Sequence, residues 1–197
     1  MDDRPEGPVG GYAPGMVSEL GVERPLRRAE YDQLVEAGAF EGEHLELIEG
    51  KLVLMSPEGP RHADVQSVVS ELLTLALHGR ARIRHGNPLA VSDTSEPEPD
   101  VSVVPLGDYR AAHPETALLA VEVSFSSLRK DRMVKPALYA GAGVAEYWIV
   151  DLVSDAVIVL TDPVDGFYRS VRTYTSGEAV TLVAFPDVAI GVDDVLG

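Results

Sequence analysis

The chain has 197 residues, of which 45% are hydrophobic and 24% are charged, a balance typical of a soluble globular protein with a proper core. It contains no cysteine, which excludes a disulfide framework and a thiolate metal site and fits a cytoplasmic location. With 32 acidic and 16 basic residues its formal net charge is −16, so its overall field repels nucleic acid. Any nucleic-acid partner must therefore be held by locally clustered positive charge or through a metal ion.

The first segment of the chain differs from the rest. Residues 1–24 are rich in glycine and proline and show no periodicity, which predicts a disordered tail in front of one domain over residues 25–197. The tail has neither the basic region nor the apolar region of a secretory signal. No apolar run in the sequence reaches the roughly 20 residues that span a bilayer, so we expect no membrane partner.

Beyond residue 24 the hydrophobic pattern changes between the helical period of 3.6 and the strand period of two. It predicts, in chain order, a helix at 25–38, a hairpin at 44–57, a long helix at 61–79, strands at 81–92, 100–105 and 118–127, a helix at 130–141, strands at 145–152 and 155–161, and short β elements at 166–190. A tight turn at Glu49-Gly50 joins the hairpin strands, and the strand at 81–92 is interrupted at Gly86 to Pro88. This order favours one α/β domain with β-rich additions.

Two of the predicted strands carry an isolated acid. In the strand that opens at Asp100, the period of two puts Asp100 and Ser102 on one face and valines on the other. In the strand at 118–127, Ala120, Glu122 and Ser124 share a face opposite a fully apolar one. If the strands are neighbours, two carboxylates converge on one side of a sheet, which is a suitable seat for Mg²⁺.

The segment after Glu122 carries charges that have more than one interpretation. Asp131 and Lys135 are four residues apart and share a helix face, and spacing alone indicates a surface ion pair that contributes little. Glu122, as a buried acid, needs a partner, and Arg129 or Arg132 would be an alternative to a metal ion. Two aromatic residues farther on are expected to belong to the core rather than to stack on bases: Tyr139 and Trp148.

Several of these segments together carry a family resemblance. In order, "LELIEGKLVLMSP", "PEPDVSVV" and "LLAVEVSFSS…DRMVKPALYAGAGVAEYWIVD" resemble the Uma-two family of predicted endonucleases, within the PD-(D/E)xK restriction-endonuclease-like superfamily. The resemblance implies an α/β fold with a restriction-endonuclease-like core, in which helices flank a central mixed β-sheet with extra β-hairpins. It places the site at one edge of that sheet.

The resemblance also implies roles for individual residues. Pro99-Asp100 matches the "PD" of the superfamily, and Glu122 matches the acid of its "ExK" motif, where Ser124 stands in place of the lysine. Family members resemble superfamily variants in which the following helix supplies the missing cation, which makes Lys135 the expected substitute.

The remaining implied residues surround the same site. Asp100, Glu122, the backbone carbonyl of Val123 and Glu46 are the expected ligands of Mg²⁺ or Mn²⁺, and His62 is expected to carry a proton or contact phosphate. The function expected from this set is metal-dependent phosphodiester hydrolysis by an endonuclease, with DNA as the substrate. The alternatives are a catalytically inactive nuclease-fold binding or scaffold module and a hydrolase of a small phosphoester.

Positive charge that could hold DNA is confined to two clusters, at 80–85 and 129–135, of which the second lies beside the expected site. Either cluster could also be an ordinary solvated face. We therefore expect weak or local nucleic-acid binding, without a visible recognition module. A homodimer is one arrangement that would supply the two active sites that a duplex cut needs.

Overall fold

The computed structural model describes residues 24–125 and 128–197, so the tail predicted at 1–24 lies outside the described residues except for Arg24. A six-stranded mixed sheet in the order β3-β4-β5-β6-β7-β8 forms the centre of the protein. Its strands are β3 (Arg82–His85), β4 (Val101–Val104), β5 (Leu119–Ser124), β6 (Glu146–Asp151), β7 (Ala156–Val164) and β8 (Phe167–Tyr174). Two small hairpin sheets accompany it, formed by β1 (Leu45–Ile48) with β2 (Lys51–Leu54) and by β9 (Ala179–Thr181) with β10 (Ala189–Gly191).

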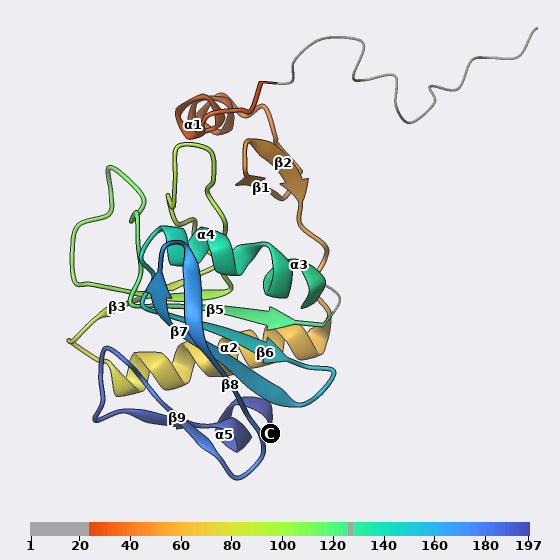
Figure 1. Cartoon of the computed structure of the whole chain (residues 1–197). Helices are drawn as coiled ribbons and strands as arrows, with labels where there is room; N and C mark the ends of the chain where they lie inside the picture. Colours follow the sequence, from red (N-terminus) through yellow and green to blue (C-terminus); the bar gives the residue numbers. More distant parts are fainter. Residues whose placement is uncertain (1–23, 126–127) are drawn as a thin grey trace, which may run out of the picture.

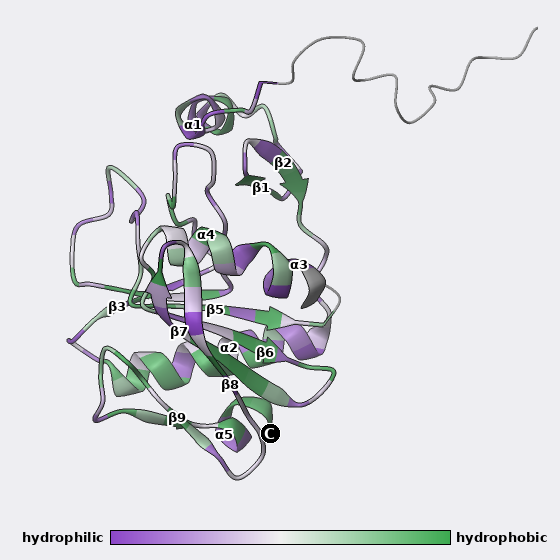
Figure 2. Ribbon diagram, in the orientation of Figure 1, coloured by the Kyte–Doolittle hydropathy of each residue, from purple (hydrophilic) through white to green (hydrophobic). Residues whose placement is uncertain are grey.

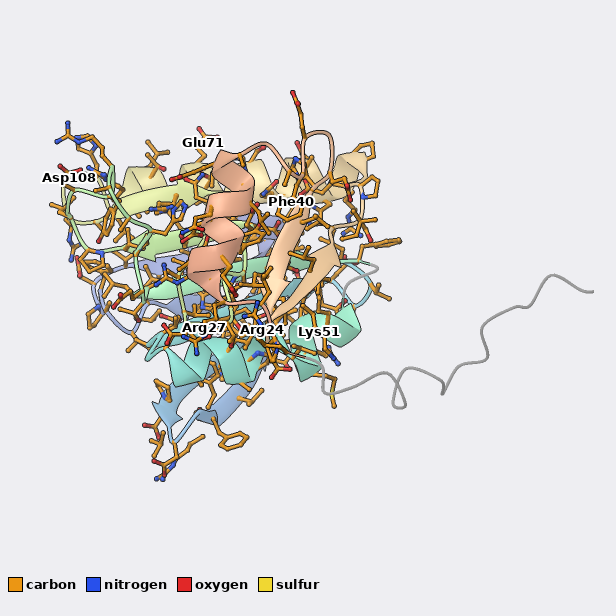
Figure 3. The ribbon with its side chains drawn as sticks, turned by 90° about the horizontal axis from the view of Figure 1, so that it is seen from above. Arg24, Arg27, Phe40, Lys51, Glu71 and Asp108 are labelled. Carbon is orange, nitrogen blue, oxygen red and sulfur yellow. The ribbon has the colours of Figure 1, made fainter. Side chains whose placement is uncertain are left out.

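The helices cover both faces of this sheet. They are α1 (Arg28–Glu36), α2 (Pro60–Ala76), α3 (Leu128–Met133), α4 (Lys135–Gly141) and α5 (Val192–Leu196). In Figure 1, α3 and α4 lie on one face, α2 and α5 lie on the other, and α1 and the β1–β2 hairpin stand beyond α4. Seen from above in Figure 3, α1 and this hairpin lie side by side over the sheet. The expected mixed sheet flanked by helices, with extra hairpins, is confirmed.

The alternating side chains of β4 and β5 explain which helix packs where. Val101, Val103, Val121 and Val123 all point to the α2 side, where they join the apolar stripe of that helix. Burying each such side chain stabilises the fold by about 1.5–3 kcal/mol. Figure 2 shows the central strands predominantly in the green of hydrophobic residues, whereas α3 carries purple segments. The polar face of β5 therefore points toward α3 and α4.

The β1–β2 hairpin is held against the loop that precedes β4. Leu47 accepts a backbone hydrogen bond from Glu96 at 2.7 Å, and Thr94 accepts one from Gly50 at 2.7 Å. Glu49 and Gly50 have φ angles of 49° and 75°, which is the pair of positive values that a two-residue hairpin turn requires. A side chain at position 50 would also collide with Pro25. This docking fixes β1, which carries Glu46 into the interior.

Three elements differ from the sequence prediction. The helix predicted at 130–141 is two helices, α3 and α4, separated at Val134, because Pro136 in the first turn of α4 has no N–H to continue the hydrogen-bond ladder. The strand predicted at 81–92 is interrupted at Gly86, as expected, where φ is 54°, but it does not resume after Pro88. Helix α5, after the predicted β elements, was not anticipated. Within the described residues no helix has the length and apolarity needed to cross a membrane.

Glu96 is a buried acid outside the candidate site, and it predicts a pH-dependent stability. Burial raises the pKa of Glu96 to about 7; the charges of Asp32 and Glu98 add to this rise, whereas the charge of Arg28 opposes it. His113 Nε2 lies 3.9 Å from Glu96 Oε1. Because the pKa in the folded state exceeds that in the unfolded state, the stabilising effect of protonation is complete below about pH 4.5 and is lost as the pH rises through 7.

We therefore expect Glu96→Gln to raise the free energy of unfolding at pH 8 by on the order of 2 kcal/mol and to change it little at pH 4.5. Urea unfolding at both pH values measures the difference. Glu43→Gln, at an exposed position, serves as the control. An equal effect of Glu96→Gln at the two pH values would contradict the prediction.

Candidate active site

Asp100 and Glu122 lie at one end of the neighbouring strands β4 and β5. The strands pair antiparallel with Val101 opposite Val121, so continuing this register by one residue sets Asp100 opposite Glu122. Both acids are buried, with exposed fractions of 7% and 4%. The expectation that these two strands are neighbours is confirmed.

Asp100 is fixed by the backbone of β5 and faces a histidine. Its Oδ2 accepts a hydrogen bond of 2.6 Å from the amide of Val123. His62, in the first turn of α2, places Nε2 3.4 Å from Asp100 Oδ2 and Nδ1 3.5 Å from Glu58 Oε2. Burial alone would lower the pKa of His62, but the hydrogen bond and charge of Asp100, together with Glu58 and the Val123 backbone, raise it. The two carboxylates therefore shift the equilibrium of His62 toward its protonated form.

Glu122 meets a lysine and a tyrosine from α4. Lys135 Nζ donates to Glu122 Oε1 at 2.6 Å, and the Tyr139 hydroxyl donates to the same oxygen at 2.7 Å. Burial raises the pKa of Glu122 well above its ordinary value, and nearby acids add to this while Lys135 opposes it. The alternative of an Arg132 partner is wrong, because that guanidinium donates to Asp151. The side chain of Arg129 lies outside what the structure describes.

Lys135 is the most enclosed cation of the site. Its side chain is 2% exposed, and its Nζ lies 3.6 Å from Glu46 Oε2 and 3.9 Å from Asp131 Oδ1. Burial lowers the pKa of Lys135, but Glu122, Glu46 and Asp131 outweigh it and raise the pKa above its ordinary value. The interpretation of Asp131 and Lys135 as a surface ion pair is therefore wrong, because both side chains are buried. A lysine held in its charged form acts electrostatically and does not accept a proton.

Ser124, which stands where the superfamily motif has lysine, holds the helix that follows. Its hydroxyl donates to Asp131 Oδ2 at 2.6 Å, and the Tyr147 hydroxyl donates to the backbone carbonyl of Asp131 at 3.0 Å. These contacts tie α3 to the polar face of β5 and β6. They thereby place Lys135, which begins α4 four residues after Asp131, where it can reach Glu122.

Glu46 enters the site from β1, and its contacts bring in a residue that sequence reasoning missed. Lys130 Nζ donates to Glu46 Oε1 at 2.5 Å, and the amide of Glu98 donates to Oε2 at 3.4 Å. From the sequence, Lys130 was counted only within the basic cluster at 129–135, and Tyr139 was expected only as a core residue. Their spacing offered a signal only for Tyr139, which is four residues after Lys135 and shares its helix face.

A cavity of about 460 Å³ opens onto these groups. Its polar wall is formed by charged and ionisable side chains: Glu58, Arg61, His62, Asp100, Glu122, Lys130, Asp131 and Lys135. Glu46 does not line it. Asp100 and Glu122, with the nearby backbone carbonyl of Val123, offer the hard oxygen donors that suit Mg²⁺ or Mn²⁺. A second grouping is present within the described residues, because Glu58, His62 and Asp100 each have a ligand atom within 4.8 Å of the others.

Comparison with known proteins identifies the family and a similar fold. A family model described as "Putative restriction endonuclease", named Uma2, matches residues 28–193. The chain belongs to the Uma2 family. The comparison of this Uma2 protein with curated proteins finds no match. Its fold resembles the crystal structure of a "putative nuclease belonging to DUF820" from Anabaena variabilis, with a TM-score of 0.70 and 16% identity over 87% of this chain and 98% of the other.

The basic cluster at 129–135 of this Uma2 protein is largely paired with acids, and the cluster at 80–85 is paired with acids in part. Arg80 forms an ion pair with Asp187 at 2.7 Å, and Arg132 forms one with Asp151 at 3.0 Å. Lys130 is bound to Glu46, as described above. Such pairs leave little net positive charge at 129–135 for nucleic-acid phosphates, whereas Arg82 and Arg84 in the other cluster lie over the ring of Tyr109.

Proposed function

We propose that this Uma2 protein is a metal-dependent endonuclease that hydrolyses phosphodiester bonds in DNA. Asp100, Glu122 and the backbone carbonyl of Val123 would hold Mg²⁺ or Mn²⁺. A cation bound there would neutralise charge on the phosphate and lower the pKa of a water molecule. The observation that carries the proposal is that both buried carboxylates and the charged Lys135 meet beside one cavity, within a chain of an endonuclease family.

The surrounding residues have distinct tasks in this proposal. Lys135 keeps Glu122 in position through its 2.6 Å hydrogen bond and adds a fixed positive charge near the phosphate. His62, whose pKa is raised by the neighbouring Asp100 and Glu58, would donate a proton to the leaving oxygen. Glu46 is the third acid, which would act on the metal through water while it accepts the hydrogen bond from Lys130.

The test is cleavage of a supercoiled plasmid and of single-stranded circular DNA by the purified full-length protein with Mg²⁺ or Mn²⁺. We expect nicking or linearisation that EDTA abolishes and that added metal restores, because the carboxylates alone do not activate water sufficiently. The double variant Asp100→Ala/Glu122→Ala controls for contaminating nucleases and should be inactive.

Cleavage by the double variant at the parent rate would reject the proposed site. Absence of cleavage by the parent, with DNA binding retained, would instead favour the inactive binding module. That alternative has one supporting observation, since Glu46 and Glu122 both accept hydrogen bonds from lysines in this structure.

A further inference from the structure

One wall of the cavity is apolar, and the proposed hydrolysis uses none of it. Its members come from β2, the loop after β2, the end of β5 and the end of β6: Val53, Leu54, Met55, Pro57, Phe125 and Leu152. Phe125 is 63% exposed and Leu54 is 66% exposed. Exposed large apolar side chains that gather at a cavity indicate a binding surface.

Phe125 lies close along the chain to the groups that would act on phosphate. It follows Glu122 by three residues and comes directly after Ser124, where β5 ends. The same cavity is lined on its polar side by Asp100, Glu122 and Lys130. A ligand with a phosphate at the carboxylates and a flat apolar group attached to it would therefore place that group against Phe125.

A nucleobase is the flat group attached to a phosphodiester, and its face stacks on aromatic side chains. Within a duplex both faces of each base are covered by neighbouring bases, so a paired base would first have to be unstacked, whereas an unpaired base can stack on Phe125 directly. A cavity of about 460 Å³ is within the size range of small-ligand pockets and is suited to a single nucleotide rather than to a double helix.

The net charge of the protein also favours a single strand over a duplex. A net charge of −16 repels nucleic acid. The repulsion is stronger for a duplex than for a single strand, because a duplex carries twice as many phosphate charges per unit of helix length as one of its strands. Stacking on Phe125 would add an attraction that salt does not screen. Lys130, whose side chain is 29% exposed, lines the cavity, but its charge is already paired with Glu46, so it adds little to the attraction of a duplex.

We propose that Phe125 and the apolar wall form a nucleobase subsite, and that the substrate is a single-stranded or unpaired segment of nucleic acid. This inference rests on the proposed function, because it takes the phosphate to lie at Asp100 and Glu122. It agrees with the expectation from the sequence that Tyr139 and Trp148 belong to the core, because both are buried and unavailable for stacking.

The first experiment uses Phe125→Trp as a fluorescent reporter. The natural Trp148 is fully buried and gives a constant background. The variant is titrated with pentathymidylate, pentauridylate and a 12-base-pair duplex, in EDTA and separately in Ca²⁺. We expect both single strands to quench the new tryptophan and the duplex to leave it unchanged. Quenching by the duplex alone would overturn the proposal. So would the absence of quenching by any of the three ligands in both EDTA and Ca²⁺.

The second experiment compares Phe125→Ala with Phe167→Ala, which removes an equally exposed phenylalanine (70%) from β8, away from the cavity. Fluorescence anisotropy of labelled pentathymidylate measures the dissociation constants. We expect Phe125→Ala to weaken binding about tenfold and Phe167→Ala to leave it unchanged. Equal dissociation constants for the parent and Phe125→Ala would overturn the proposal.

The two proposals fail in different ways. If strand binding depends on Phe125 but no metal produces cleavage, the subsite stands and the endonuclease function does not. If duplex plasmid is cut and Phe125→Ala cuts it at the parent rate, the endonuclease function stands and the subsite does not.

Discussion

Replacing Lys135 with methionine is expected to abolish metal-dependent cleavage and to lower the free energy of unfolding by about 3–5 kcal/mol. The reason for the loss of stability is burial. Lys135 Nζ is 2.6 Å from Glu122 and 3.6 Å from Glu46, and both acids are almost fully enclosed. Methionine fills a similar volume but leaves these carboxylates without their shared cation, and an uncompensated buried charge costs more than the ion pair gains.

Two further variants separate the effect on the free energy of unfolding from the effect on cleavage. Glu122→Gln/Lys135→Met removes both partners, so we expect it to recover part of the lost stability and to remain inactive. Lys130→Met removes a lysine that is 29% exposed, and Glu46 keeps Lys135, so the loss should be about 1 kcal/mol. Urea unfolding and plasmid nicking, carried out well below the melting temperature, measure the two effects. A Lys135→Met protein as stable and as active as the parent would reject this role of the lysine.

Asp100→Asn should weaken binding of Mn²⁺ by at least about 100-fold and abolish cleavage while the fold is retained. The carboxamide oxygen of asparagine can still accept the 2.6 Å hydrogen bond from Val123, so β4 and β5 stay in register. What is lost is the negative charge beside Glu122. Isothermal titration calorimetry with Mn²⁺ measures the affinity directly, and circular dichroism checks the fold.

Glu58→Gln is the matched control for Asp100→Asn, because Glu58 lines the same cavity but is not among the expected ligands. If the ion is held by Asp100 and Glu122, this variant should bind Mn²⁺ within a few-fold of the parent. An equally large loss in Glu58→Gln would place the ion among Glu58, His62 and Asp100 instead. Unchanged affinity in Asp100→Asn would remove Asp100 from the metal site altogether.

The regular elements near the site follow from local rules that a sequence displays. Side chains alternate along a strand, so the faces that carry Asp100 and Glu122 are readable without coordinates. The apolar runs on the opposite faces predict burial against a helix, and α2 provides it. Residue spacing likewise places Asp131, Lys135 and Tyr139 on one side of the chain after β5.

Contacts between segments that are distant in the sequence could not be predicted from local patterns. Lys130 and Glu46 are 84 positions apart and meet only because the β1–β2 hairpin docks on the loop before β4. The burial of Asp131 and Lys135 depends on how α3 and α4 sit on the sheet, and from spacing alone this pair resembled a surface ion pair. The exposure of Phe125 could not be predicted either, because the strand period places it on the apolar face with Val121 and Val123, whereas β5 ends at Ser124.

The sequence by itself determined the order of helices and strands, the two acidic strand faces and the family resemblance, since each depends on short-range periodicity or on residues in fixed order. Only the tertiary structure decided that Ser124 anchors α3 through Asp131, that Lys135 reaches Glu122, and that an apolar wall faces the carboxylates. The physical reason is that burial and side-chain partners are set by packing between elements, which local patterns do not specify.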